Sequence, residues 1–243
     1  MINQLNKVIY IHPPKTGGWS IINIYGWNSP LVDVNNAVGE DRYELFPNHH
    51  TIQFYDLRGF EIGNYFRFAT IRNPWERVVS AYSWLTSNAM ARLKKPKDDS
   101  EYPFEMYLSH LSADMVDLSH EKNNSQWTRP NCIMDYICID GKVAVDYICS
   151  MHSLESDFEF VRQILECPHK LPHANKSSHK DYRSYYTDET AETVGKIFKK
   201  DIDFFGYTFD DPKPREFDRV IDHARVESYR EKRNLLVRGF TKL

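Results

Sequence analysis

The chain has 243 residues, of which 41% are hydrophobic and 14% aromatic, with a formal net charge of −3 and a pI near 6.4. This composition excludes a disordered chain, and its mild acidity gives no general reason to expect binding to nucleic acid. An anion-binding site must therefore be built locally. The four cysteines form no CxxC pair, so the pattern predicts free thiols and no metal site.

The sequence shows no targeting or membrane-spanning segment. A strand-like run follows Met1 within a few residues, without a basic and apolar leader, and no run approaches the roughly 18 apolar residues of a membrane helix. We therefore expect a cytoplasmic protein without a membrane span. The length fits one domain over residues 1–243, with a core of about residues 7–209 and a helical extension of about residues 214–243.

Hydrophobic periodicity predicts strands that alternate with helices. The predicted strands are residues 7–12, 65–71 and 144–149. The predicted helices begin near Gly17 and Pro74, cover residues 104–111, 153–165 and 187–198, and include one more in the tail near residues 217–224. This alternation is typical of an α/β fold with a largely parallel sheet.

The stretch from Val8 to Ile21, VIYIHPPKTGGWSI, joins the first strand to the first helix. A glycine pair at a helix start lets backbone N–H groups approach an anion closely. Thr16 and Ser20 add hydroxyl donors, and Lys15 adds a positive charge. The lysine precedes the glycines, so the GxxxxGK[ST] pattern of triphosphate-binding loops is absent. On its own, the stretch is also compatible with a plain strand–helix turn.

Residues 66–84, FRFATIRNPWERVVSAYSW, form a second strand–turn–helix unit. Arg72 ends the strand, and Ser80 lies about two turns inside the helix. The planar guanidinium of Arg72 suits a phosphate monoester, and Arg77 is a further cation nearby. Taken alone, Arg72 is better explained as a strand-capping residue that pairs with a carboxylate such as Glu76.

Together, the two units resemble the two cofactor loops of sulfotransferases. The closer likeness is to the carbohydrate sulfotransferase branch, whose loop typically reads H-I-P-K-T-G-G-T-S, and Phe66 to Tyr82 is similar to its F-x-F-x-x-V-R-N-P-x-x-R-x-x-S-x-Y. Further matches are Val145 to Phe158, Leu171 to Asn175, residues 185–187 and Asp201 to Phe209. The resemblance covers about residues 7–209. It implies a P-loop-like, three-layer α/β/α fold with a central, mainly parallel sheet.

The resemblance implies that the cofactor is 3′-phosphoadenosine 5′-phosphosulfate (PAPS), with 3′-phosphoadenosine 5′-phosphate (PAP) as its product. Arg72 and Ser80 would hold the 3′-phosphate. The 5′-phosphosulfate would be held by Lys15, Thr16, Gly17, Gly18, Trp19 and Ser20. Trp19 stands where the family has Thr, which removes a hydroxyl expected on the 5′-phosphate. Either Ser20 and backbone N–H groups replace that hydroxyl, or Trp19 packs on the adenosine.

Sulfuryl transfer needs an acceptor hydroxyl that loses its proton, stabilisation of the leaving 5′-phosphate, and in-line geometry. Lys15 fits the second role. His50, which precedes Arg72 by 22 residues as a histidine does in the resembling branch, is the expected base, with His49 second. Alternative bases are Asp56, Glu44 and Glu40. The mechanism requires no metal and no covalent enzyme intermediate.

Two other functions remain open. A P-loop-type small-molecule kinase shares the strand–loop–helix geometry, but it needs a lysine after the glycines. A non-catalytic domain that binds nucleotide or glycan would not need both predicted phosphate sites and a histidine pair. The expected partner is an acceptor with a free hydroxyl, such as a glycan, while a metabolite, lipid or peptide tyrosine stays possible. Trp75 and Trp84 are expected in the core.

Overall fold

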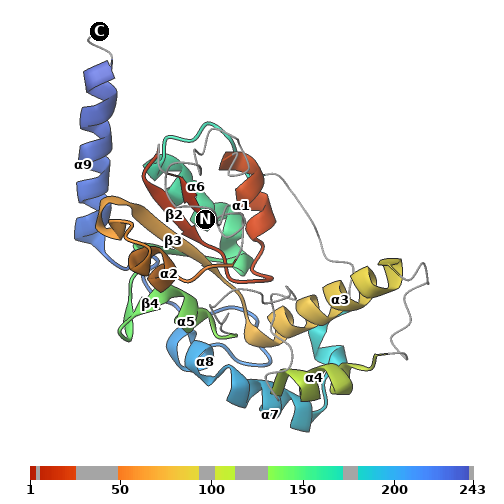
Figure 1. Ribbon diagram of the computed structural model, residues 1–243. Coiled ribbons are helices and arrows are strands. Elements are labelled where there is room, and N and C mark those ends of the chain that lie inside the picture. The colour runs from red at the N-terminus through yellow and green to blue at the C-terminus, as the bar shows by residue number, and fades with distance from the viewer. Residues whose placement is uncertain (4–5, 26–48, 93–101, 113–130, 172–179, 241–243) are drawn as a thin grey trace.

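The computed structural model describes residues 1–3, 6–25, 49–92, 102–112, 131–171 and 180–240. Its centre is a four-stranded sheet in the order β1 (Ile2–Asn3), β2 (Val8–Ile11), β3 (Phe66–Ile71) and β6 (Tyr147–Ser150). Strands β2, β3 and β6 run parallel, and β1 runs antiparallel to β2. The predicted α/β fold with a mainly parallel sheet is confirmed (Figure 1).

Helices cover both faces of this sheet, so every residue of β2, β3 and β6 is buried. Alternate side chains of β2 therefore join two different cores. Val8 and Tyr10 pack with α1 (Gly18–Tyr25) and α6 (Leu154–Ile164) on one face. Ile9 and Ile11 belong to the larger core on the other face, which contains α3 (Pro74–Arg92). The result is a three-layer arrangement.

The other described elements surround this centre. They are α2 (Ile52–Leu57), α4 (Phe104–Ser112), α5 (Ile133–Ile137), the hairpin of β4 (Cys138–Ile139) and β5 (Lys142–Val143), α7 (Asp188–Ile197), α8 (Lys199–Phe205) and α9 (His223–Phe240). Three short 3-10 turns lie at Ile62–Asn64, Met151–Ser153 and Tyr182–Tyr185. Within the ranges given above, no helix is long and apolar enough to cross a bilayer.

The predicted tail helix was placed too early. Helix α9 begins only at His223. Val220 instead forms an antiparallel bridge with Tyr147 of β6, and the backbone N–H of Ile221 donates to the carbonyl of Asp146 at 2.9 Å. The unpaired edge of β6 offered these hydrogen bonds, and they override the helical spacing of the tail.

The start of α3 is fixed by the RNP sequence. Pro74 occupies the first helical position, where its missing N–H costs nothing. The Asn73 side-chain oxygen accepts hydrogen bonds from the N–H groups of Trp75 and Glu76, at 3.0 and 3.4 Å. The helix therefore begins directly after β3, and Arg72 is held at the junction between them.

Candidate active site

The candidate site lies where three neighbouring parallel strands end. The loop with Lys15 follows β2, Arg72 follows β3, and His152 follows β6. Because β3 pairs with both β2 and β6 in parallel, their carboxyl ends lie at one edge of the sheet. This edge is where open α/β sheets bind their ligands.

The loop after β2 is packed too closely for side chains at its two glycines. Gly17 has a φ of +81°, and a Cβ there would lie 2.4 Å from the sulfur of Met151. A Cβ at Gly18 would lie 2.2 Å from the ring of the buried His12. Lys15 also has a positive φ, of +65°, which is uncommon for a residue with a side chain. The backbone here forms a tight curve, as a close-fitting anion cradle requires.

Thr16 fastens this loop to the sheet. Its side chain is completely buried, and its hydroxyl donates to the carbonyl of Pro13 at 2.7 Å. The same oxygen lies 2.6 Å from the hydroxyl of Thr70 in β3. In this arrangement the Thr16 hydroxyl is turned into the protein, so its predicted role toward a phosphate would fall to its backbone N–H.

Arg77 supports the loop from inside the protein. This fully buried side chain donates from Nε to the carbonyl of Pro14 at 2.8 Å and from Nη1 to the carbonyl of Asn131 at 2.6 Å. Asp201, also fully buried, lies 3.9 Å away as its counter-charge. Arg77 is therefore a structural brace between α3 and the loop, and not a further surface cation for a ligand.

Lys15 and Arg72 bring two positive charges together at the strand ends. Arg72 Nη1 donates to the carbonyl of Lys15 at 3.2 Å. Burial, with the charge of Arg72 adding to it, lowers the pKa of Lys15 to about 8. The Lys15 ammonium lies 5.3 Å from the ring centre of Trp84, a cation–π contact. Two partly buried cations this close favour an anionic ligand between them.

Glu76 and His152 extend this charged cluster toward α6. The Arg72 Nε lies 3.6 Å from the Glu76 carboxylate, one helical turn ahead, so the pairing considered for Arg72 exists. His152 Nε2 donates to the same carboxylate oxygen at 3.0 Å. Burial raises the pKa of Glu76, but the hydrogen bond from His152 and the charge of Arg72 outweigh it, and the net pKa is lowered. Glu76 is thus a carboxylate held between the guanidinium of Arg72 and the imidazole of His152.

The remaining predicted cofactor residues, Trp19, Ser20 and Ser80, lie near the N-terminal ends of α1 and α3. Ser80 is buried in α3, two turns beyond Arg72, and Ser20 is buried in α1. Trp19 lies in the first turn of α1, but its side chain is outside the described residues. The predicted roles of these three residues stay predictions.

The two candidate base histidines have different surroundings. His49 Nδ1 lies 2.7 Å from the carbonyl of His12, and the two rings meet edge to face at 4.7 Å between their centres. A carbonyl can only accept, so His49 Nδ1 carries a proton in this contact. His50 stacks on Phe54 of α2 at 3.8 Å between ring centres. Among the alternative bases, Asp56 is exposed on α2, and Glu40 and Glu44 lie outside the described residues.

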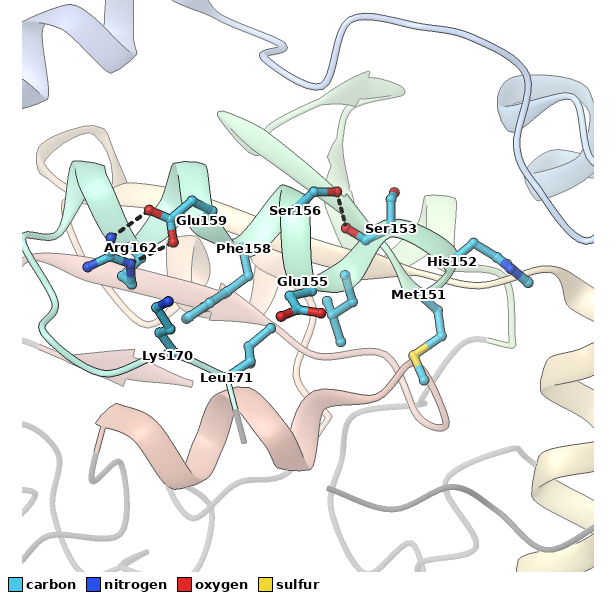
Figure 2. A pocket seen from close by; sticks show the side chains of 11 residues that line it. Met151, His152, Ser153, Glu155, Ser156, Phe158, Glu159, Arg162, Lys170 and Leu171 are labelled. Atoms are coloured by element: carbon cyan, nitrogen blue, oxygen red, sulfur yellow. Dashed lines mark hydrogen bonds and ion pairs between the residues drawn. The ribbon is translucent and has the colours of Figure 1, made fainter. Parts of the chain in front are cut away.

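A cavity of about 630 Å³ opens beside the loop. Figure 2 shows that its lining comes from α6 and the turn before it and from Lys170 and Leu171, with Phe158 and Leu171 between α6 and α1. Met151 is one of the lining residues, and its sulfur would lie 2.4 Å from a Cβ at Gly17. His152 also belongs to the lining. The cavity therefore adjoins both predicted phosphate sites.

Sequence reasoning missed three contributors to this edge. Glu76 was considered only as a competing partner of Arg72, and His152 was left without a role. The rule that parallel strands end at one edge could have found His152, since it follows a predicted strand. Trp84 was expected in the core together with Trp75, which is buried, but 42% of Trp84 is exposed. Its position beside Lys15 depends on the course of α3, which periodicity alone does not give.

The comparison with protein families agrees with this geometry. A model of the sulfotransferase family matches residues 1–208, which is most of the 243-residue chain. No curated protein and no solved structure matches the chain.

The residues present fit the cofactor of this family, which carries phosphate groups on both sides of a ribose. The loop turns tightly at Gly17 into the start of α1, and Lys15 and Arg72 supply positive charge at two neighbouring strand ends. The buried Arg72 Nε has no hydrogen-bond acceptor among the described residues, so that donor is available to a ligand. The chain belongs to the sulfotransferase family and is a PAPS-dependent sulfotransferase.

Proposed function

We propose that the chain transfers the sulfuryl group of PAPS to a hydroxyl of a carbohydrate acceptor, by in-line displacement with a histidine base. The observation that carries this proposal is the meeting of Lys15 in the glycine loop with Arg72 at the neighbouring strand end. When bound, PAPS supplies the sulfuryl group that moves to the acceptor oxygen. The residues of the chain bind the cofactor, orient the acceptor for in-line transfer and stabilise the charge on the leaving phosphate.

In this proposal the loop of Lys15 to Ser20 holds the 5′ end of the cofactor, and Arg72 with Ser80 holds the 3′-phosphate. The cavity beside the loop, lined by Leu154, Phe158 and Leu171, receives the adenosine. Lys15 neutralises the charge that grows on the leaving 5′-phosphate oxygen as its bond to sulfur breaks. Loss of one such preorganised contact reduces the rate by about 10²–10³-fold.

The acceptor hydroxyl passes its proton to one histidine of the His49–His50 pair. Spacing from Arg72 favours His50. In neutral His49 the hydrogen bond to the carbonyl of His12 places the proton on Nδ1, which is the tautomer of a general base that accepts at Nε2. The acceptor oxygen then bonds to sulfur while the bond from sulfur to the 5′-phosphate oxygen breaks.

Two single variants assign the base. Alanine at the catalytic histidine lowers turnover by about 10²–10⁴-fold, because proton transfer is lost, and leaves PAP binding nearly intact. Alanine at the other histidine retains turnover within a few fold and serves as the matched control. Near-normal turnover in both His49→Ala and His50→Ala would rule out a histidine base and favour the exposed Asp56.

The carbohydrate acceptor is supported by the position of Trp84. Its exposed indole lies beside the Lys15 ammonium, close to where the acceptor must approach, and a flat apolar ring suits packing against a sugar. A labelled-PAPS screen over glycans, small hydroxylated metabolites, lipids and tyrosine peptides identifies the acceptor class. Trp84→Ala is expected to raise the acceptor KM without changing the Kd for PAP. Trp84→Phe keeps an aromatic ring, and its acceptor KM is expected to lie close to that of the wild type.

A thermal-shift comparison separates this function from the two alternatives. PAP is expected to raise the Tm more than AMP, ATP, ADP or NAD, and EDTA is expected to leave the effect unchanged. Greater stabilisation by ATP with Mg²⁺ would instead support a small-molecule kinase. PAP binding without transfer to any acceptor in the labelled screen would support a non-catalytic nucleotide-binding domain.

A further inference from the structure

Glu76 occupies the place at Arg72 where a bound phosphate is expected. Its carboxylate lies 3.6 Å from Arg72 Nε and accepts a hydrogen bond from His152 Nε2 at 3.0 Å. The side chains of Arg72 and Glu76 are 10% and 16% exposed, so water screens this cluster weakly. A carboxylate here competes with an incoming phosphate for the same guanidinium.

The distances show that this competition is incomplete. At 3.6 Å the Arg72–Glu76 contact is an ion pair without a hydrogen bond, and Arg72 Nε has no acceptor among the described residues. The shorter contact of Glu76 is with His152. His152 therefore holds the carboxylate while Arg72 keeps a donor free.

We propose that His152 and Glu76 form a specificity-determining pair for the 3′-phosphate. This inference rests on the proposed function, in which Arg72 binds that phosphate. A phosphate monoester brought to Arg72 meets the negative charge of Glu76, and repulsion between the two anions opposes binding. His152 is a positioning residue that holds the Glu76 carboxylate by a hydrogen bond, so the carboxylate does not close onto Arg72 Nε and the guanidinium can accept a second anion.

The position of His152 links this pair to the cavity. His152 follows β6, lines the cavity beside the loop, and reaches across to α3 through Glu76. The pair thus lies between the cavity proposed for the adenosine and the Arg72 guanidinium. A nucleotide with a 3′-phosphate meets the pair, whereas a nucleotide without one leaves the Arg72–Glu76 contact undisturbed.

The test compares the Kd for PAP with the Kd for AMP, which lacks the 3′-phosphate, by calorimetry on the full chain. In His152→Ala, the affinity for PAP is expected to fall about tenfold while the affinity for AMP stays within twofold, since residues in one charged network couple on this scale. In Glu76→Gln the affinity for PAP is expected to be equal to or higher than that of the wild type. The double variant Glu76→Gln/His152→Ala is expected to match Glu76→Gln.

Two further variants sharpen the result. His152→Gln keeps a hydrogen-bond donor at this position, and it is expected to retain much of the PAP affinity that His152→Ala loses. Glu155→Gln removes a carboxylate from the same cavity lining without touching Arg72, and it is expected to leave the ratio of the two Kd values unchanged.

Three outcomes overturn the inference. Equal weakening of PAP and AMP in His152→Ala would show a purely structural role. A loss of PAP affinity in the double variant as large as in His152→Ala would show that His152 acts without Glu76. An unchanged ratio of the two Kd values in both His152 variants would show that the residue has no part in recognition. If wild-type protein binds PAP no better than AMP, the proposed function itself fails.

Discussion

Lys15 is held in an unfavourable state for an ordinary lysine. Its backbone lies in the left-handed region, with a φ of +65°, which costs on the order of 1–3 kcal/mol in a residue with a side chain. Burial also lowers its pKa to about 8. The packed loop around Lys15 compensates both costs. It holds the ammonium at the strand end, where we propose that negative charge develops on the leaving phosphate.

The first prediction concerns the pH dependence of this lysine. The pKa of Lys15 in the free enzyme is lowered to about 8 from 10.5, so the positive charge is present below pH 8 and is lost as the pH rises through 8. The kcat/KM for PAPS is therefore expected to fall above pH 8. Lys15→Arg keeps its charge in this range, and its residual kcat/KM is expected to lack that basic limb. The same basic limb in Lys15→Arg would assign it to another group.

The second prediction concerns Gly18, whose conformation is ordinary but whose surroundings leave no space. A Cβ there would lie 2.2 Å from the His12 ring, and that ring is fixed between Tyr10, stacked at 5.6 Å, and His49. Gly18→Ala is expected to lower the free energy of unfolding by about 1–3 kcal/mol and to weaken PAP binding. Urea unfolding and calorimetry measure the two effects.

Two controls test the cause of the Gly18 effect. Gly63→Ala adds a Cβ that meets nothing within 4 Å, so its cost is expected to be small. In a His12→Ala background the clash partner is absent, and adding Gly18→Ala is expected to cost little more. A Gly18→Ala protein as stable as Gly63→Ala would show that the loop relaxes around the methyl group.

At the scale of elements, α3 holds the site because its N-terminus is fastened on two sides. The Asn73 oxygen caps the helix, while its side-chain nitrogen donates to the carbonyls of Thr208 and Asp211, at 3.0 and 3.3 Å. Arg77, one turn later, braces the loop through the carbonyl of Pro14. The position of Arg72 therefore depends on segments far apart in the sequence.

The third prediction separates the two functions of Asn73. Asn73→Ala removes the cap and both tethers, and is expected to lower the free energy of unfolding by about 2–3 kcal/mol. Asn73→Ser keeps a capping oxygen without adding a buried charge and loses the tethers to residues 208 and 211, so its loss is expected to be smaller. Urea unfolding of both variants measures the difference. Equal losses in the two would mean that the tethers to residues 208–211 carry the whole effect.

Several elements could be predicted because their local signals agree with their packing. The RNP sequence marks the start of α3, and Thr187 caps α7 in a reciprocal pair with Thr190. The β4–β5 hairpin was missed although its turn has a strong signal, Asp140-Gly141, with positive φ at both residues. Helix α2 was missed because its six residues span fewer than two turns, which is too short to show helical periodicity. Burial of its apolar side chains stabilises it.

Only part of the candidate site could likewise be predicted from the sequence. Lys15, Arg72 and Ser80 could be named because strand–turn–helix motifs are written in consecutive residues. The rule that parallel strands end at one edge could suggest His152, but not its contact with Glu76 beside Arg72, since that cluster joins two strand ends 80 residues apart. Its formation requires that β3 and β6 be neighbours, and the sequence alone does not specify strand order.

At the scale of the whole molecule, the segment after residue 208 completes the fold, although the family match ends there. Residues 219–221 add an antiparallel strand-like bridge along the free edge of β6, with Ile148 N–H donating to the carbonyl of Arg219 at 3.0 Å. Arg225 at the start of α9 donates to the buried Asp146 at 2.8 Å, which also pairs with Arg67 of β3. Figure 1 shows α9 extending away from the rest of the molecule toward the C-terminus.

The fourth prediction tests this closure by truncation. A chain ending at residue 213 loses the bridge to β6 and Arg225, and leaves the buried Asp146 with Arg67 alone. It is expected to lose about 4–6 kcal/mol of unfolding free energy, from hydrogen bonds of about 1 kcal/mol each and the broken buried charge pair, and to aggregate through its exposed edge. Urea unfolding and light scattering measure the two effects.

A chain ending at residue 233 is the matched control, because it keeps the bridge, Arg225 and the buried Val226 while removing the end of α9. It is expected to fold and bind PAP like the full chain. The single variant Arg225→Met removes the ion pair with Asp146 together with the hydrogen bonds to the carbonyls of Gly63 and Tyr65. It is expected to lose less than the truncation at residue 213, because the bridge remains. If the chain ending at residue 213 folds as stably as the full chain, the family domain is self-sufficient and the C-terminal segment does not stabilise the fold.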